Sequence, residues 1–298
     1  MATLNTTALL VGLGPLIGWG LFPTIASKIG GKPANQILGT TLGTFIFGLA
    51  FALIGGYSLP TGSSLFLSII SGIGWASAQI VTFMSFNLVG SSRVMPITTA
   101  FQLLGASLWG VIALGNWPGV KAKIIGGLAL VAIIIGAYMT VWSENKTAQK
   151  TNLLKKAVIW LLFGEIGYWL YSAAPQAARV DGQHAFLPQA IGMLLTGIGY
   201  GIYVSLKNPK QNPFKELVSY QQIFAGFFFA FAALTYLISA QPNMNGLATG
   251  FVLSQTSVIL ATLTGIWFLG QKKTKKELII TIIGLVIILI AAAVTEFI

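Results

Sequence analysis

Ten apolar stretches, each close to twenty residues long, limit what this chain can fold into. A helix needs about 20 consecutive apolar residues to cross the hydrocarbon core of a bilayer. Backbone groups in lipid must satisfy their own hydrogen bonds, so isolated stretches of this kind cross as helices. We therefore predict an all-α integral membrane protein with ten transmembrane helices. The stretches cover residues 6–27, 36–58, 65–88, 94–114, 124–142, 157–177, 186–206, 217–238, 246–269 and 278–297.

The composition excludes several other classes of protein. Only 8% of the residues are charged and 55% are hydrophobic, and the mean hydropathy is +0.82. A soluble domain carries about 25% charged residues, so an ordinary soluble enzyme is excluded. The chain has no cysteine, and its single histidine is His184, so we expect neither a metal site nor a cofactor. The basic residues lie between apolar runs and form no basic face, so nucleic acid is not an expected partner.

The distribution of basic residues predicts the orientation in the membrane. We number the nine connections between the predicted spans in chain order. Cytoplasmic loops of membrane proteins carry an excess of lysine and arginine, so the odd connections should be cytoplasmic and both termini extracytoplasmic. The even connections hold only Lys121, Lys123 and Arg179. The odd connections hold the other fourteen of the 17 basic residues: Lys28, Lys32, Arg93, Lys146, Lys150, Lys155, Lys156, Lys207, Lys210, Lys215, Lys272, Lys273, Lys275 and Lys276.

Short sequence pieces recur in the same order in the two halves of the chain. QILG at 36–39 corresponds to QAIG at 189–192, and GVIALG at 110–115 corresponds to GIWFLG at 265–270. These pieces divide the chain into residues 1–145 and 146–298, with five predicted spans in each. Because five is odd, the second half would insert upside down relative to the first. Inverted repeats of this kind are typical of secondary transporters that bind substrate near the bilayer midplane.

Glycines four residues apart occur in several predicted spans. Gly14 and Gly18, Gly39 and Gly43, and Gly197 and Gly201 have this spacing. Small residues at this spacing let helices in lipid approach each other closely. We interpret these glycines as helix-packing positions.

One carboxylate falls in the middle of a predicted span. Glu165 lies eight residues into the stretch 157–177, near the bilayer midplane. A charged side chain there costs about 2.5–3.5 kcal/mol on insertion scales, so it should face the bundle interior, a partner or water. One hypothesis is that Glu165 carries a proton and couples uptake to the proton gradient. The alternative is a permanently protonated or hydrogen-bonded group with a structural role.

Amide and aromatic side chains recur at helical spacing in the same spans. Trp75 and Gln79 are four residues apart, and Gln102 and Gln255 lie on polar stripes of the fourth and ninth spans. Amides that pair with hydroxyl groups, together with aromatic faces that cover C–H surfaces, suit a sugar site. Polar side chains also join helices, and tryptophans also form interfacial belts, so each residue has a structural alternative. The candidate substrate-binding residues are Trp19, Gln36, Trp75, Gln79, Gln102, Tyr168, Trp169, Gln189 and Gln255, of which Gln79, Gln102 and Trp169 lie farthest from the span ends.

Four longer stretches resemble a known family. NQILGTTLG at 35–43 and MPITTAFQLLG at 95–105 resemble the second- and fourth-span signatures of the bacterial glucose/ribose porters. GYWLY at 167–171 and LPQAIGM at 187–193 are similar to stretches in the second half of that family. The family belongs to the drug/metabolite transporter superfamily, and within it the chain looks more like the ribose uptake branch of lactic acid bacteria. Gln36, Gln102 and Gln189 are members of these motifs.

The resemblance implies a specific function and also has two departures. It implies ten helices in a 5+5 inverted repeat and uptake of a neutral sugar, ribose or glucose, across the cytoplasmic membrane by proton symport. Relatives often have Leu-Gly-Glu-Trp after the fourth span, where this chain has LGNW at 114–117. Glu165 is not a known part of the family pattern, which puts proton coupling through this residue in doubt.

Two other functions remain to be compared with a sugar importer. An exporter of amino acids, amphipathic metabolites or drugs could use the same architecture, and fold analogy cannot separate the two. A cation exporter should place acids in its cavity, and Glu165 is the one acid that we expect there, which favours a neutral substrate. A membrane-embedded enzyme would need a catalytic cluster, and one histidine with one intramembrane acid does not provide it.

Overall fold

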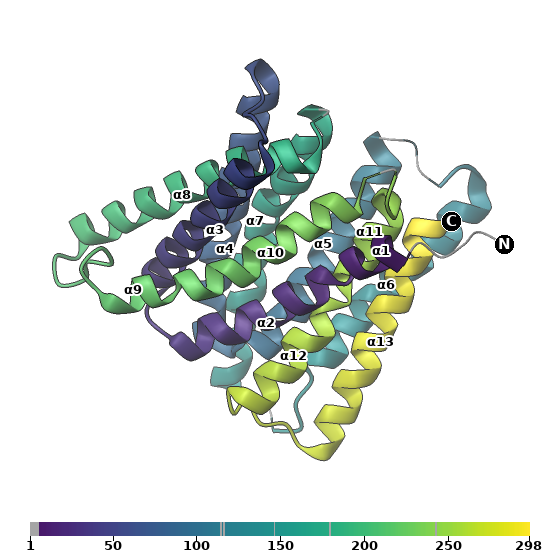
Figure 1. Ribbon diagram of the computed structural model, residues 1–298. Helices are drawn as coiled ribbons and strands as arrows, with labels where there is room; N and C mark the ends of the chain where they lie inside the picture. Colours follow the sequence, from purple (N-terminus) through teal and green to yellow (C-terminus); the bar gives the residue numbers. More distant parts are fainter. Residues whose placement is uncertain (1–5, 114, 116, 146, 179, 242) are drawn as a thin grey trace.

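The computed structural model describes residues 6–113, 115, 117–145, 147–178, 180–241 and 243–298, and this part of the chain is helical without strands (Figure 1). Apolar runs form helices because lipid offers the backbone no other partners, and the interior prolines Pro23, Pro96 and Pro188 do not end them. The helices are α1 (Thr6–Gly12), α2 (Gly14–Ile29), α3 (Pro33–Gly55), α4 (Gly62–Val89), α5 (Ser91–Ala113), α6 (Gly119–Val141), α7 (Ala148–Ala178), α8 (Gly182–Lys207), α9 (Leu217–Gln221), α10 (Ile223–Ser239), α11 (Gly246–Gln255), α12 (Ser257–Phe268) and α13 (Lys275–Phe297).

These helices make ten spans, as predicted. Ten helical segments of the described chain are long and apolar enough to cross a membrane, so the protein is a multi-pass membrane protein. Three spans each consist of two helices: α1 and α2 meet at Leu13, α9 and α10 at Gln222, and α11 and α12 at Thr256. Discontinuous spans of this kind are common around the sites of secondary transporters.

One boundary differs clearly from the sequence-based expectation. Residues 143–156 were predicted to be a polar connection, but α7 already begins at Ala148. The hydroxyl of Thr147 accepts a 3.3 Å hydrogen bond from the Lys150 N–H, which satisfies a free donor of the first turn. Lysine and glutamine form helices well in water, so α7 continues beyond the apolar segment that a hydropathy criterion detects.

The connections gather at two opposite ends of the bundle. Helix α1 and the C-terminus lie at the end that we call the terminal face, together with the connections 56–61 and 240–245 (Figure 1). The other end, which we call the lysine face, holds the connections 30–32, 142–147, 208–216 and 269–274. Two of the basic residues used to predict the orientation, Lys146 and Arg179, lie outside the described residues.

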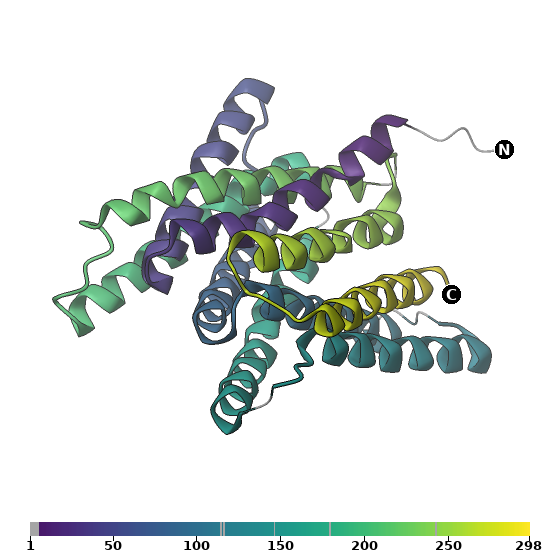
Figure 2. The same cartoon turned by 90° about the horizontal axis from the view of Figure 1, so that it is seen from below.

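The helix contacts recur with an offset of five spans. The third span, α4, packs on α7 and α8, and the eighth span, through α10, packs on α2 and α3. The fourth span, α5, packs on α7, and the ninth, through α12, packs on α2. Three further pairs bring equivalent spans together: α3 with α8, α5 with α12, and α6 with α13. Figure 2 shows α6 and α13 side by side at one edge of the bundle.

Glycines bring these helices into backbone contact. A Cβ atom added to Gly39 would lie 1.9 Å from the carbonyl oxygen of Ser219, and one added to Gly43 would lie 2.3 Å from that of Ile223. The equivalent contact between α8 and α4 is made by Gly192, which corresponds to Gly39, where a Cβ would lie 2.1 Å from the carbonyl oxygen of Ile69. Helix packing in lipid depends on such close approach, which agrees with our interpretation of the Gly39 and Gly43 pair.

Large apolar side chains cover much of the outer surface. Ile54 and Ile112 are 88% and 80% exposed, which would be costly in water but is ordinary where lipid is the solvent. The interior holds aromatic side chains, with Phe83, Phe186 and Phe229 almost fully buried. The polar residues described next therefore lie beside a core cluster in which aromatic rings are mixed with aliphatic side chains.

Candidate functional site: a polar cavity at the terminal face

A cavity of about 670 Å³ lies between α5 and α7 and is bounded by residues at the ends of α10, α11 and α13. Gly115, Pro118 and Ile298 belong to its lining, so the cavity reaches the terminal face. Its volume lies within the range of about 300–1,000 Å³ that is usual for small-molecule sites. We call it the terminal-face cavity. Its polar and aromatic lining residues include Gln102, Ser107, Trp109, Trp117, Glu165, Tyr168, Trp169, Ser172, Tyr236, Thr295 and Glu296.

Glu165 is the buried acid of this cavity. It is only 4% exposed, and among the described residues neither of its carboxyl oxygens has a hydrogen-bond partner. Its position follows from the packing of α7 on α4, because Gly167 touches the α4 backbone, where a Cβ would lie 2.3 Å from the carbonyl oxygen of Gly74. A buried acid without protein partners is a functional-site signal, since structural acids are normally paired.

A hydrogen-bond network joins α4 to α7 next to Glu165. The hydroxyl of Tyr168 donates to Oε1 of Gln79 at 2.8 Å and is 2.9 Å from the hydroxyl of Thr82. Nε2 of Gln79 is buried and has no partner among the described residues. The network therefore holds the Gln79 amide in place by its oxygen and leaves its N–H donors free for another group.

Aromatic rings surround this network. Trp75 stacks on Phe229 with ring centroids 3.9 Å apart, and Trp19 lies 5.6 Å from Tyr236. Within the described chain, the indole N–H of Trp19 and the hydroxyl of Tyr171 are also buried without partners. Flat apolar faces with a few free polar atoms between them can accommodate the alternating C–H and O–H surface of a sugar.

The structure brings most of the predicted site residues into this region. Trp19, Trp75 and Tyr168 belong to or pack against one aromatic core cluster, and Gln79 bonds to Tyr168 within it. Gln102 and Trp169 line the terminal-face cavity with Glu165. Nε2 of Gln102 donates to the Thr98 hydroxyl at 3.3 Å, so its amide keeps further capacity.

Trp169 and Gln255 differ in their surroundings, because Trp169 is partly exposed whereas Gln255 is buried. The indole of Trp169 lies against the backbone of Gly105, where a Cβ would be 1.7 Å from Nε1, and the residue is 41% exposed. Gln255 is the last residue of α11, directly before the break at Thr256, and its Nε2 is 3.3 Å from the Ser254 hydroxyl. Trp169 therefore lines the outer part of the cavity, whereas Gln255 is not among its lining residues.

Gln36 and Gln189 lie away from the cavity, at helix junctions. Nε2 of Gln36 donates to the carbonyl oxygen of Ala26 at 3.3 Å, and Nε2 of Gln189 donates to the Ser71 hydroxyl at 2.9 Å. The Ser71 hydroxyl in turn donates to the carbonyl oxygen of Tyr171. These contacts join helices, and the prediction that Gln36 and Gln189 bind substrate stays a prediction.

Sequence reasoning missed several residues that line the cavity, among them Glu296 and Tyr236. Our expectation that Glu165 is the one acid of the cavity is wrong, because Glu296 lines it as well. Glu296 falls inside the predicted span 278–297, and that position was the available signal. Tyr236 was also missed, because nothing in the sequence distinguishes it from an interfacial tyrosine. Within the described residues, no group of three acidic, histidine or cysteine side chains is placed to hold a metal.

A tryptophan at the rim ties the connection after α5 to α13. The indole of Trp117 donates to the carbonyl oxygen of Thr295 at 3.0 Å, and its ring lies against Gly126. Trp117 belongs to the LGNW piece that departs from the family pattern, of which Leu114 and Asn116 lie outside the described residues. The rim of the cavity is thereby anchored close to Glu296.

Comparisons with known proteins identify the family and the fold of this chain. Three similar relatives carry the name "Putative ribose uptake protein RbsU". The relative from Enterococcus faecalis is 68% identical over 99% of this chain and 100% of its own length. Those from Lactobacillus johnsonii and Lactiplantibacillus plantarum are 70% and 68% identical, each over 98% of this chain and 99% of its own length. A solved structure titled "Crystal structure of protein" shares the fold, with a TM-score of 0.59 and 17% identity over 97% of this chain and 96% of that chain. The model of the family described as "Sugar transport protein" matches residues 10–298, so this chain belongs to the sugar transport protein family.

Proposed function

We propose that the protein is a secondary active transporter that imports a neutral sugar, ribose or glucose, across the cytoplasmic membrane. The observation that carries this proposal is the terminal-face cavity, where the amide of Gln102 and the ring of Trp169 adjoin the unpartnered carboxyl of Glu165. The names of the relatives and the family description point to sugar uptake and, by name, to ribose.

The substrate site is proposed to extend from this cavity toward the bundle centre. Tyr168 belongs both to the cavity lining and to the hydrogen-bond network with Gln79. Trp75 and Trp19 lie beyond it in the same aromatic cluster and would cover the C–H faces of the sugar. The free N–H groups of Gln79 and Trp19 would bond sugar hydroxyl groups, since buried donors gain most from a partner.

The two halves, residues 1–145 and 146–298, are proposed to be inverted repeats that alternate the access to this site. The offset of five spans in the helix contacts supports this proposal. In this mechanism one half rocks against the other around the fixed site. The terminal-face cavity would be the outward opening, since the positive-inside rule assigns the lysine face to the cytoplasm.

Glu165 is the proposed proton carrier. A carboxyl group that is buried without a partner gains or loses a proton according to whether the cavity is open to water, which is the property that coupling requires. In this scheme the proton and the sugar enter from the terminal face and leave at the lysine face. Glu296 at the cavity wall would be the first acid that a proton meets.

Transport by purified protein in proteoliposomes tests the proposal. The wild type should accumulate labelled ribose or glucose when an acidic exterior is imposed. Glu165→Gln should abolish accumulation while it keeps sugar counterflow, because exchange needs no net proton movement. Glu144→Gln, which changes a carboxylate at the lysine face, is the matched control and should behave like the wild type. Intact accumulation by Glu165→Gln would remove the coupling role.

A second candidate function gains support from Glu296. Two carboxyl groups line the cavity, and paired acids suit a cationic or amphipathic substrate that is exported in exchange for protons. Efflux of a panel of amines and amino acids from the same proteoliposomes distinguishes the two functions. Efflux without transport of any sugar would favour the exporter.

A further inference from the structure

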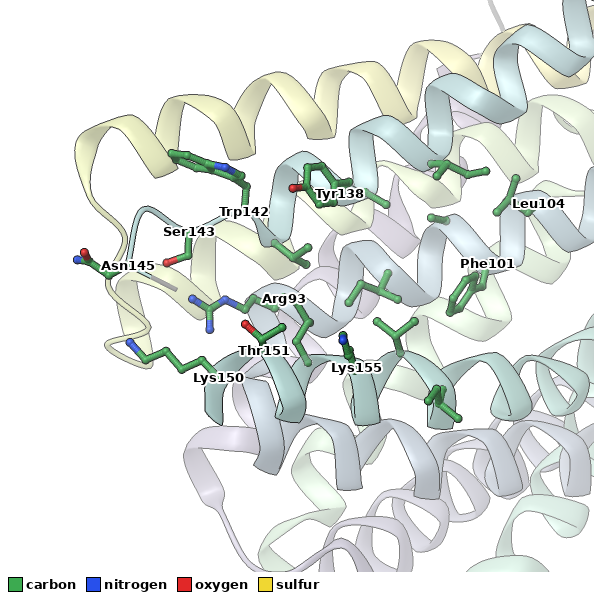
Figure 3. A pocket seen from close by; sticks show the side chains of 18 residues that line it. Arg93, Phe101, Leu104, Tyr138, Trp142, Ser143, Asn145, Lys150, Thr151 and Lys155 are labelled. Atoms are coloured by element: carbon green, nitrogen blue, oxygen red, sulfur yellow. The ribbon is translucent and has the colours of Figure 1, made fainter. Parts of the chain in front are cut away.

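A second hollow of about 520 Å³ lies at the lysine face, between α5, α6 and α7 (Figure 3). None of its lining residues belongs to the terminal-face cavity. Helix α5 packs on both α6 and α7, but the described parts of α6 and α7 make no extended contact with each other. We call this feature the lysine-face groove.

The inner part of the groove is apolar. Phe101 and Leu104 lie at the end far from the connections, and Tyr138 lies on the α6 wall (Figure 3). Ile134 on α6 and Ile159 on α7 are both 54% exposed, so the walls continue into the lipid-facing surface of the protein. The remaining apolar lining residues are Ile97, Ala100, Ala137, Val141, Leu154 and Val158. Apart from the hydroxyl of Tyr138, this lining offers a sugar no side-chain hydrogen-bond partner, and it suits a hydrocarbon chain.

The mouth of the groove is cationic. Arg93 and Lys150 lie beside Ser143 and Asn145 at the end near the connection 142–147, and Lys155 lies one turn farther along α7 (Figure 3). Over the described part of the chain, no carboxylate lies within ion-pair distance of these three side chains.

The neighbouring acids are engaged with other groups. Glu277 accepts hydrogen bonds from the Ser143 hydroxyl and the Glu144 N–H, and Glu144 pairs with Lys276 at 3.7 Å. The positive charge at the mouth also acts on the neighbouring Lys273. Burial, and after it the charge of Arg93, lowers the pKa of Lys273 to about 8. The mouth therefore has an uncompensated positive potential.

We propose that the lysine-face groove binds one anionic phospholipid, with an acyl chain along α5 and the phosphate on Arg93, Lys150 and Lys155. Charge complementarity selects this occupant, because basic pockets between transmembrane helices attract anionic head groups. The long side chains of arginine and lysine reach the head-group level while their stems lie on apolar surface. A zwitterionic lipid would fill the apolar part equally well but would gain less from the three cations.

Lipid retention by the purified full-length protein tests the proposal. The probe is phosphatidylglycerol, compared with phosphatidylcholine of the same acyl chains, and the measurement is native mass spectrometry after titration in detergent. We expect one phosphatidylglycerol molecule to bind at least 10-fold more tightly than phosphatidylcholine. Equal retention of the two lipids would overturn the proposal.

Two matched pairs of variants locate the site. Lys155→Gln should lower phosphatidylglycerol affinity about 3- to 10-fold, whereas Lys156→Gln, which removes the same charge one residue away beside Trp160, should leave it unchanged. Ile134→Trp should block the groove for both lipids, whereas Ile135→Trp, at a position 51% exposed outside the groove, should not.

These four positions are exposed, so the variants should fold. Equal effects within either pair would overturn the proposal. In the double variant Arg93→Gln and Lys155→Gln, the ratio of the affinities for phosphatidylglycerol and phosphatidylcholine should fall close to one. An unchanged preference in a double variant that still elutes as a folded protein would also overturn it.

Discussion

Tyr168 on α7 donates its hydroxyl proton to Oε1 of Gln79 on α4 at 2.8 Å, and this bond fixes the direction of the Gln79 amide. The two residues are 89 positions apart in the sequence and come from different halves of the chain. The packing of α4 on α7 places this bond directly beside the unpartnered carboxyl of Glu165. Because its oxygen is held, the Gln79 amide does not need to rotate to present its two N–H donors to the interior.

Tyr168→Phe should weaken sugar binding. The change removes the hydroxyl that orients the Gln79 amide, so the N–H donors proposed for the sugar lose their fixed direction, which should cost about 1–3 kcal/mol of sugar binding. We expect the KM for sugar uptake to rise by roughly 5- to 100-fold. Tyr138→Phe on the exposed surface of α6 is the control and should leave KM unchanged. If Tyr168→Phe had the KM of the wild type, the Gln79 amide would not be part of the sugar site.

Single cysteines should report the orientation, because the chain has no cysteine of its own. Ser58 lies in the connection between α3 and α4 at the terminal face, and Asn208 follows α8 at the lysine face. A membrane-impermeant maleimide should label Ser58→Cys in intact cells and Asn208→Cys only after lysis. The reverse labelling pattern would contradict the proposed orientation, and labelling of both in intact cells would contradict an odd number of spans between them.

Lys273 should make the free energy of unfolding depend on pH above about pH 8. Burial and the neighbouring Arg93 lower its pKa to about 8, against about 10.4 for an unperturbed lysine. Between these values the unfolded chain holds more protons than the folded protein, so the free energy of unfolding rises as pH increases from about 8 to about 10.

Thermal unfolding in detergent at pH 7.5 and 9.5 measures this effect. Lys273→Gln should raise Tm at pH 7.5 by about 2–4 °C. Between pH 7.5 and pH 9.5, the Tm of this variant should rise less than the Tm of the wild type. Lys272→Gln, at the exposed neighbouring position, is the control for the lost charge. Parallel pH curves for Lys273→Gln and the wild type would contradict the prediction.

Two glycines of α8 should respond differently to alanine. A Cβ at Gly192 would lie 2.1 Å from the carbonyl oxygen of Ile69, so α8 and α4 would have to separate. At Gly199 a Cβ meets nothing within 4 Å. Overpacking costs about 1–3 kcal/mol, so Gly192→Ala should lower Tm by roughly 3–10 °C.

Gly199→Ala should leave Tm unchanged or slightly higher, because alanine favours a helix more than glycine does. Thermal denaturation of both variants in the same detergent checks the prediction. Equal Tm values for the two variants would mean that the α4–α8 contact tolerates an extra methyl group.

The pattern of apolar residues along the sequence predicted the spans well, because a bilayer of fixed thickness requires apolar stretches of similar length. Each predicted apolar stretch overlaps one of the observed spans. The ends were less accurate where helices leave the lipid: Ala148–Lys156 is helical although it is polar, since helix propensity continues in water after hydropathy has fallen. The breaks at Leu13, Gln222 and Thr256 were not predicted. Pro15 follows the first break, but no proline or glycine adjoins Gln222 or Thr256.

The sequence by itself determined the class of protein, the ten spans and the burial of Glu165, because the cost of polar groups in lipid acts on each residue separately. Its motifs indicated the family. Only the tertiary structure decided which polar residues share a space. It placed Gln102, Trp169 and Glu296 in one cavity with Glu165, and it assigned Gln36 and Gln189 to contacts between helices. Helical spacing shows which residues share one face of a helix. Which other residues that face contacts depends on the packing of helices that are far apart in the chain.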